Sequence, residues 1–120
     1  MMWFMRTAFF AAGLLAGWTA QAEPDGEQVF KHSCSICHTV EPNKTKVGPS
    51  LAHVVGRPAS SIDGFSYSDA NKHSGVVWTE QVLDTYLTNP QAFMPGTRMT
   101  FPGLKDPADR QAVINYLRLH

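Results

Sequence analysis

Two cysteines and a histidine form the densest group of reactive side chains in the sequence. Cys34 and Cys37 are separated by two residues and His38 follows directly, which gives the motif Cys-Ser-Ile-Cys-His. Two thiols at this spacing lie about one helical turn apart. Such a pair can hold a metal, form a redox disulfide or bond covalently to a prosthetic group, with the imidazole as a neighbouring ligand. These chemistries differ in what they need from the rest of the chain.

The remaining residues decide between the alternatives. A structural zinc site needs four ligands, and the chain has no second cysteine pair. A thioredoxin-like redox site needs βαβ surroundings, and a structural disulfide here would close a loop too small to stabilise much. Cys-x-x-Cys-His is the attachment motif of c-type haem, in which the thiols add to the vinyl groups and the imidazole binds iron. We therefore predict one haem c, covalently bound through Cys34 and Cys37, with His38 as an axial ligand.

The second ring nitrogen of His38 needs a partner of its own. A ligating histidine usually donates that N–H to a carbonyl, which fixes the orientation of the ring. Pro49 has a carbonyl but no competing N–H, and its Gly48-Pro49-Ser50 loop can return to the histidine. Pro49 is therefore a candidate acceptor, and an ordinary loop proline is an equal alternative.

The sixth iron ligand separates an electron carrier from an enzyme. A methionine raises the reduction potential and closes the iron to exogenous ligands. After residue 22 the methionines are Met94 and Met99, in a loop rich in Pro and Gly, and the histidines besides His38 are His32, His53, His73 and His120. A methionine in a small domain is more often core filler, so the local pattern favours Met99 only modestly.

The first 22 residues have the three parts of a secretory signal. Arg6 precedes an apolar stretch over residues 7–18, and Ala20-Gln21-Ala22 places small residues where a signal peptidase reads. Cleavage after Ala22 leaves one haem domain, residues 23–120, and predicts a periplasmic protein. The apolar stretch is short for a spanning helix, which needs about 20 residues. A retained anchor at the outer face of the inner membrane is the alternative.

Composition and periodicity predict an all-α domain with long loops. Helices are expected from residue 25 to about 38, over 68–72, from 79 to 89 and from 106 onward, with caps at Asp25, Thr79 and Asp106. Residues 39–66 have no sustained period, and so long a loop is acceptable only if it wraps a ligand. Charges are balanced, with no basic stripe, which excludes nucleic acid as a partner.

Read in order, the motifs resemble those of class I cytochromes c, most closely the mitochondrial type and its bacterial cytochrome c2 relatives. The resemblance covers residues 26 to about 119 and includes Gly26-x-x-x-Phe30, Cys34-x-x-Cys37-His38, Gly48-Pro49, Gly56-Arg57, Gly64 to Asn71, Trp78, Tyr86-Leu87-x-Asn89-Pro90, Pro95 to Met99, Phe101 and Tyr116-Leu117. It implies the cytochrome c fold, with about three to five helices around one haem. It also implies a small electron carrier, not an enzyme.

The resemblance assigns roles to further residues. Met99 occupies the family's Pro-Gly-Thr-(Lys/Arg)-Met position, which makes it the sixth ligand, and Pro49 accepts from His38. Tyr67 and Trp78 match donors to a buried haem propionate, which Arg57 would neutralise. On the methionine side of the haem, a polar group is matched by Asn71, Tyr86 and Thr97. Phe101 matches the aromatic that covers the haem edge, and Gly26 and Tyr116 match a close helix crossing. Without the resemblance, the buried aromatics read as core residues and Arg57 as a solvated charge.

Lysines that often surround the haem edge in the family are partly missing here. Ser33 precedes Cys34, and Gln91-Ala92 follow Asn89-Pro90; the remaining candidate cations are Lys31, Lys44, Lys46, Lys72, Arg98 and Lys105. Charge steering should therefore be weaker than in basic relatives. The resemblance implies a monomer with transient redox partners, such as a quinol–cytochrome c reductase, a terminal oxidase, a photosynthetic centre or a periplasmic dehydrogenase. The alternative functions are a membrane-anchored carrier and a peroxidase or gas-binding protein with an open sixth site.

Overall fold

Five α-helices lie in the part of the chain that the computed structural model describes, which is residue 8, residues 10–17 and residues 23–120. They are α1 (Gly26–Ser33), α2 (Asp69–Lys72), α3 (Glu80–Thr88), α4 (Pro90–Phe93) and α5 (Pro107–Arg118). Within these residues the only strand-like pairing is an isolated bridge between Pro58 and Val77. The predicted all-α class is therefore confirmed.

Side-chain caps begin α1, α3 and α5 where the sequence predicts them. The Asp25 carboxylate accepts from the N–H of Glu27 at 3.0 Å, and Thr79 Oγ1 accepts from the N–H of Val82 at 3.1 Å. Asp106 caps α5 in the same manner, with Pro107 at the first helical position. Each cap satisfies an N–H that the first turn of a helix leaves without a partner.

The first helix ends earlier than predicted. α1 stops at Ser33, and the residues of the Cys-x-x-Cys-His motif follow as turns instead of a continued helix. The carbonyl of Cys34 accepts from the N–H groups of both Cys37 and His38, at 3.1 and 2.9 Å. The carbonyl of Phe30 likewise accepts from both Cys34 and Ser35, so the regular one-to-one pattern of the helix is lost there.

A short helix that was not predicted follows α3. The helix expected from 79 to 89 ends at Thr88, and Asn89 then caps α4 by accepting from the N–H of Ala92 at 3.2 Å. Pro90 takes the first position of α4, where its missing N–H costs nothing. The same dipeptide therefore ends one helix and begins the next.

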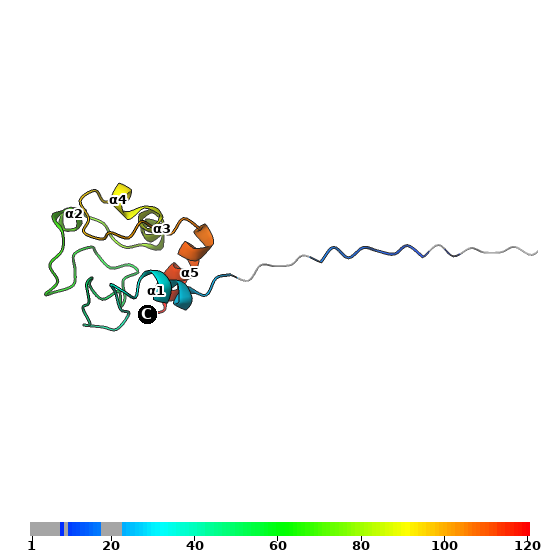
Figure 1. Cartoon of the computed structure of the whole chain (residues 1–120), viewed down its shortest axis with the longest axis horizontal. Coiled ribbons are helices and arrows are strands. Elements are labelled where there is room, and N and C mark those ends of the chain that lie inside the picture. The colour runs from blue at the N-terminus through cyan, green and yellow to red at the C-terminus, as the bar shows by residue number, and fades with distance from the viewer. Residues whose placement is uncertain (1–7, 9, 18–22) are drawn as a thin grey trace, which may run out of the picture.

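The first and last helices cross at a glycine. A Cβ atom on Gly26 would lie 2.2 Å from the carbonyl oxygen of Ala112 and 2.8 Å from Cβ of Tyr116. The ring of Phe30 packs against that of Tyr116, with centroids 5.4 Å apart. Figure 1 shows α1 and α5 next to each other at one side of the helical body. The predicted close crossing is confirmed.

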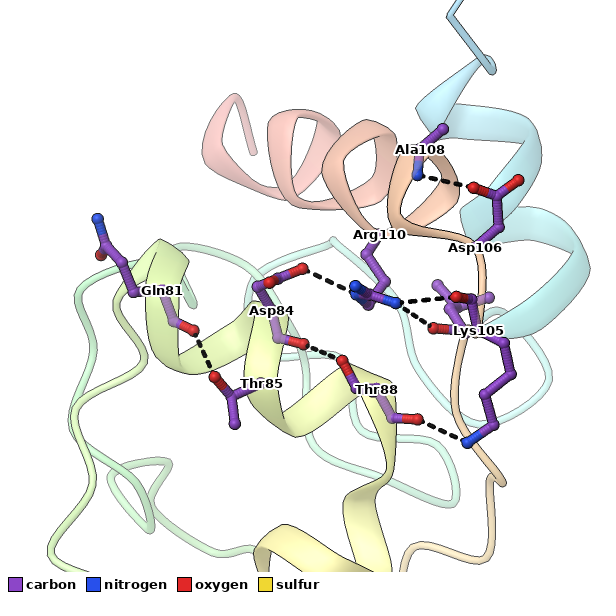
Figure 2. Close-up of polar contacts among 9 residues, drawn as sticks. Gln81, Asp84, Thr85, Thr88, Lys105, Asp106, Ala108 and Arg110 are labelled. Carbon is purple, nitrogen blue, oxygen red and sulfur yellow. Dashed lines mark hydrogen bonds and ion pairs between the residues drawn. The ribbon is translucent and has the colours of Figure 1, made fainter.

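A polar cluster joins α3 to the segment that precedes α5. Arg110 Nε donates to Asp84 Oδ1 at 2.8 Å, and its Nη1 donates to the carbonyls of Leu104 and Lys105 (Figure 2). Lys105 Nζ donates to the carbonyl of Thr88 at 2.7 Å, at the C-terminal end of α3. The two cations thus hold residues 104–105 against α3, because each donates to backbone carbonyls as well as carrying charge.

The predicted signal segment lies largely outside the described residues, including the cleavage region at 18–22. Phe10, Leu14 and Leu15 are described, and their side chains are almost fully exposed. Residues 10–17 lead away from the helical body (Figure 1). Among the described residues no helix has the length and apolar character needed to cross a membrane.

Candidate haem-binding site

The two cysteines of the motif lie in the turns after α1 and are not joined by a disulfide. Both are half-buried, whereas Ile36 between them is 76% exposed. Burial, with a smaller contribution from Cys37, raises the pKa of Cys34 to about 11. Because neither sulfur takes part in a disulfide, both can form thioether bonds.

The imidazole of His38 is oriented by backbone groups. Its Nδ1 lies 2.8 Å from the carbonyl oxygen of Pro49, and because that oxygen can only accept, Nδ1 carries the hydrogen. Nε2 then keeps its lone pair for a metal. Burial lowers the pKa of His38, while the hydrogen bond to Pro49 opposes this. The neutral ring is the form that binds iron.

Gly48 also contacts the His38 ring, a role that the sequence analysis did not assign. A Cβ at residue 48 would lie 2.3 Å from Cε1 of His38, and the N–H of Gly48 donates to the carbonyl of Cys37 at 2.8 Å. The backbone of this loop therefore lies against the face of the imidazole. Only glycine permits such a close approach, but a Gly-Pro pair in a loop is too common to reveal it.

The two methionines of the domain have different environments. Met94 is 4% exposed and belongs to the hydrophobic core. Met99 is half-buried, and its sulfur accepts a hydrogen bond from the hydroxyl of Tyr86 at 3.2 Å. Burial raises the pKa of Tyr86 although the Thr97 side chain opposes this, so the hydroxyl stays protonated and donates. Thr97 Oγ1 also accepts from the N–H of Met99 at 3.2 Å.

Arg57 and Tyr67 supply donors that lack an acceptor. Arg57 Nη1 and Nη2 donate to the carbonyls of Ala52 and Ser50 at 2.8 and 3.1 Å, so this residue is not a freely solvated charge. Its Nε is buried and has no partner among the described residues. The hydroxyl oxygen of Tyr67 accepts from the N–H of Ile62 at 3.1 Å, which leaves its hydrogen for another acceptor. Because a buried donor without a partner is costly, a carboxylate such as a haem propionate fits here.

The other predicted site residues are only partly brought together. Trp78 is buried, its ring centroid lies 4.8 Å from that of Tyr86, and its backbone N–H donates to the carbonyl of Arg57. Asn71 Oδ1 accepts from Ser60 Oγ at 2.7 Å instead of joining Tyr86 and Thr97 by a described hydrogen bond. Phe101 is half-buried in the segment just after Met99.

One residue that contacts the Met99 segment was not predicted. Gln91 Nε2 donates to the carbonyl of Met99 at 2.7 Å and to the carbonyl of Phe101 at 3.0 Å. No sequence pattern marks it, because an exposed glutamine after Asn-Pro is compatible with any surface position.

Together these groups fit a c-type haem. The chain offers two free thiols, a neutral imidazole with one nitrogen engaged, a thioether and a buried donor suited to an anion. This combination on an all-α scaffold with long loops defines a covalent haem protein.

Comparison with known proteins places the chain more closely. The sequence model of the Cytochrome c family matches residues 24–120. The chain is 50% identical over 117 residues to cytochrome c2 of Rhodomicrobium vannielii, and this match covers 94% of the chain and 93% of that protein. It is 46% identical over 111 residues to cytochrome c2 of Blastochloris viridis, and that match covers 92% of the chain and 87% of the relative. The solved structure of cytochrome cH from Methylobacterium extorquens superposes with a TM-score of 0.74 at 41% identity, covering 79% of this chain and 95% of that one. The chain belongs to the cytochrome c family.

Several predictions from the sequence are thereby confirmed. The protein has the cytochrome c fold and carries one covalent haem c, with iron, through Cys34 and Cys37. It is a monohaem electron carrier that acts between redox partners, not an enzyme.

Proposed function

We propose that this cytochrome carries single electrons through the periplasm, with His38 and Met99 as the axial ligands of its iron. The observation that carries the ligand assignment is the hydrogen bond from Tyr86 to the Met99 sulfur, which sets this thioether apart from the buried Met94. Haem supplies reversible one-electron chemistry when it is bound. The residues of the chain determine how rigidly the groups around the haem, including its axial ligands, are held in place.

The groups that fix the two axial ligands favour fast electron transfer because they keep those ligands in place. His38 is fixed by Pro49 and Gly48, and Met99 by Tyr86 and Thr97, so neither ligand needs to move when the oxidation state changes. Filled axial positions also exclude exogenous ligands, which distinguishes a carrier from a peroxidase or a gas-binding protein. Arg57, Tyr67 and Trp78 are suited to hold a propionate carboxylate away from solvent.

Electrons would leave through the haem edge near Cys34, Cys37 and Phe101. Ile36 and Val47, both 76% exposed, lie on segments joined by the hydrogen bonds from Lys46 Nζ to the Ser35 carbonyl and from the Gly48 N–H to the Cys37 carbonyl. A small docking surface around these two exposed side chains suits brief encounters between redox proteins. The proposed redox partners are a quinol–cytochrome c reductase, a terminal oxidase, a photosynthetic centre or a periplasmic dehydrogenase. The cytochrome would meet them as a monomer.

Part of the predicted signal segment is shared with a relative. The family match starts at residue 24, whereas a match to 94% of the chain cannot be confined to residues 23–120. The cytochrome c2 of Rhodomicrobium vannielii therefore has a counterpart of the N-terminal segment. N-terminal sequencing of the native protein tests cleavage: a chain that starts at Glu23 is expected, and an intact Met1 would mean that residues 1–22 remain as an anchor.

Spectra of two methionine variants test the ligand assignment. The wild-type ferric protein should be low-spin, with a weak sulfur-to-iron band at the red end of the spectrum. Met99→Ala should lose that band and become high-spin, whereas Met94→Ala should keep it and lose about 2–5 kcal/mol of unfolding free energy through the cavity it creates. A high-spin wild type that Met99→Ala leaves unchanged would refute the proposal. The reduction potential from an optical redox titration would then narrow the choice of redox partners.

A further inference from the structure

We infer that the side-chain amide of Gln91 is a positioning group that holds Met99 in its axial place. It does so by fastening the two backbone carbonyls on either side of Thr100, those of Met99 and Phe101. This inference rests on the proposed ligation of iron by Met99. It adds a residue on α4 that controls how readily that ligand leaves.

The hydrogen-bond chemistry fixes how the amide is used. Gln91 Nε2 lies 2.7 Å from the carbonyl oxygen of Met99 and 3.0 Å from that of Phe101. Both oxygens are acceptors, so the amide nitrogen and not the amide oxygen must face them. That nitrogen has two hydrogens, one for each carbonyl. The pair of bonds therefore works as a clamp across a three-residue segment.

The clamp stands on a rigid base. Gln91 is the second residue of α4, directly after Pro90, whose side chain is among the most completely buried in the described part of the chain. Asn89 caps this short helix through the N–H of Ala92, and the N–H of Phe93 closes it by donating to the carbonyl of Asn89 at 3.1 Å. The backbone of Gln91 is therefore fixed while its side chain reaches the segment at 99–101.

With the clamp included, Met99 is held at three different atoms. Thr97 accepts from its N–H, Tyr86 donates to its sulfur, and Gln91 donates to its carbonyl. For the thioether to leave the iron, residues 99–101 must move outward. Thr100 is exposed, so solvent lies on the outer side of this segment and does not block the movement. The two Gln91 hydrogen bonds do oppose it, because they must break before the carbonyls of Met99 and Phe101 can move away from α4.

Imidazole binding to the ferric holoprotein measures this opening. Imidazole can bind only after Met99 has left, so the limiting rate at saturating imidazole reports the opening of the loop. Loss of two partly exposed hydrogen bonds should raise that rate roughly tenfold in Gln91→Ala. Gln91→Glu has the same length but no donor, and its charge repels both carbonyls, so its rate should rise at least as much.

Two further variants separate the clamp from a general effect of mutation. Gln91→Lys restores donors at the end of a long side chain and should return the rate to within about threefold of wild type. Gln81→Ala changes an exposed glutamine of α3 that makes no described hydrogen bond to residues 99–101, and should leave the rate unchanged. The free energy of global unfolding should fall by no more than the free energy of loop opening in Gln91→Ala, because both processes break the same two hydrogen bonds.

The outcomes distinguish this inference from the ligand assignment. An unchanged limiting rate in Gln91→Ala, a wild-type rate in Gln91→Glu, or a loss of global stability that exceeds the change in loop opening would each overturn the clamp. Met99→Ala serves as the separate reference: it should bind imidazole without the slow opening step. If Met99→Ala instead behaves like wild type, the proposed ligation fails, whatever the Gln91 variants do.

Discussion

The hydroxyl of Tyr86 lies 3.2 Å from the sulfur of Met99 and donates a hydrogen bond to it. Tyr86 belongs to α3 and is buried between two rings, with centroid distances of 4.8 Å to Trp78 and 5.7 Å to Phe93. The core of the domain therefore positions a donor at the thioether. A hydrogen bond of this kind draws electron density from the sulfur and makes it a weaker donor to the iron that we propose it binds.

Tyr86→Phe should lower the reduction potential. Without the hydroxyl, the Met99 sulfur donates more strongly to iron and stabilises the ferric state. A net hydrogen-bond contribution of about 0.5–1.5 kcal/mol corresponds to a fall of roughly 20–60 mV for a one-electron couple. An optical redox titration measures it. Tyr116→Phe is the matched control, since Tyr116 packs on Phe30 at the helix crossing and should leave the potential unchanged; equal shifts in both variants would contradict a specific role for Tyr86.

Gly26→Ala should destabilise the domain without altering the haem spectrum. The added methyl carbon would lie 2.2 Å from the carbonyl oxygen of Ala112, and both contact partners are backbone or Cβ atoms that cannot rotate away. Separating α1 from α5 to relieve this should cost about 1–3 kcal/mol. Guanidinium unfolding of the holoprotein measures the loss. Gln28→Ala, on the exposed part of α1, should stay within about 0.5 kcal/mol of wild type, and a Gly26→Ala protein of equal stability would show that the crossing tolerates a side chain.

Local sequence signals predict the helix starts and the haem attachment because the physics involved is local. Asp25, Thr79 and Asp106 cap the backbone within three residues of themselves, so their effect can be read from neighbouring residues. The Cys-x-x-Cys-His motif is likewise complete within five residues. The order of further motifs was enough to identify the family.

Contacts between distant segments could not be predicted in the same way. The closeness of Gly48 to the His38 ring and the reach of Gln91 to the carbonyls at 99 and 101 depend on how loops return in space. The early end of α1 depends on the Phe30 carbonyl accepting two N–H groups, which no local propensity requires. The resemblance placed Asn71 with Tyr86 and Thr97, but its side chain is engaged by Ser60 across a loop.

Arg57→Ala should affect both stability and potential. It removes the donors to the carbonyls of Ala52 and Ser50 and takes away a positive charge, whose presence disfavours the more positive ferric haem. We expect a loss of about 1–3 kcal/mol and a potential lower by tens of millivolts, roughly 20–60 mV. Unfolding and redox titrations measure the two effects.

Arg57→Lys separates the two effects of Arg57. Lysine keeps the charge but cannot serve two carbonyls and a third acceptor with a planar fork. Its stability should fall as in Arg57→Ala, while its potential stays close to wild type. A wild-type potential in Arg57→Ala would show that this residue only fastens the loop.

Electron transfer to a small anionic oxidant should depend little on ionic strength. Two of the candidate rim cations are engaged in ion pairs: Lys31 pairs with Glu27 at 3.0 Å, and Lys44 pairs with Glu41 at 3.1 Å. These exposed pairs add little stability, but each cancels a charge that would steer a partner. The rate of oxidation by ferricyanide should therefore change by less than about threefold between ~0.01 and ~0.2 M salt.

Removing the two acidic partners should restore the salt dependence. Glu27→Gln combined with Glu41→Gln frees Lys31 and Lys44, so oxidation by ferricyanide should become faster at low salt and fall as salt rises. Glu80→Gln is the matched control, because Glu80 pairs with Arg118 and joins the start of α3 to the end of α5. If Glu80→Gln, which removes one negative charge, changes the salt dependence half as much as the double variant, which removes two, then net charge and not the local pairs governs the approach of the oxidant. A steep dependence in the wild type would show instead that the pairs leave the lysine charges effective.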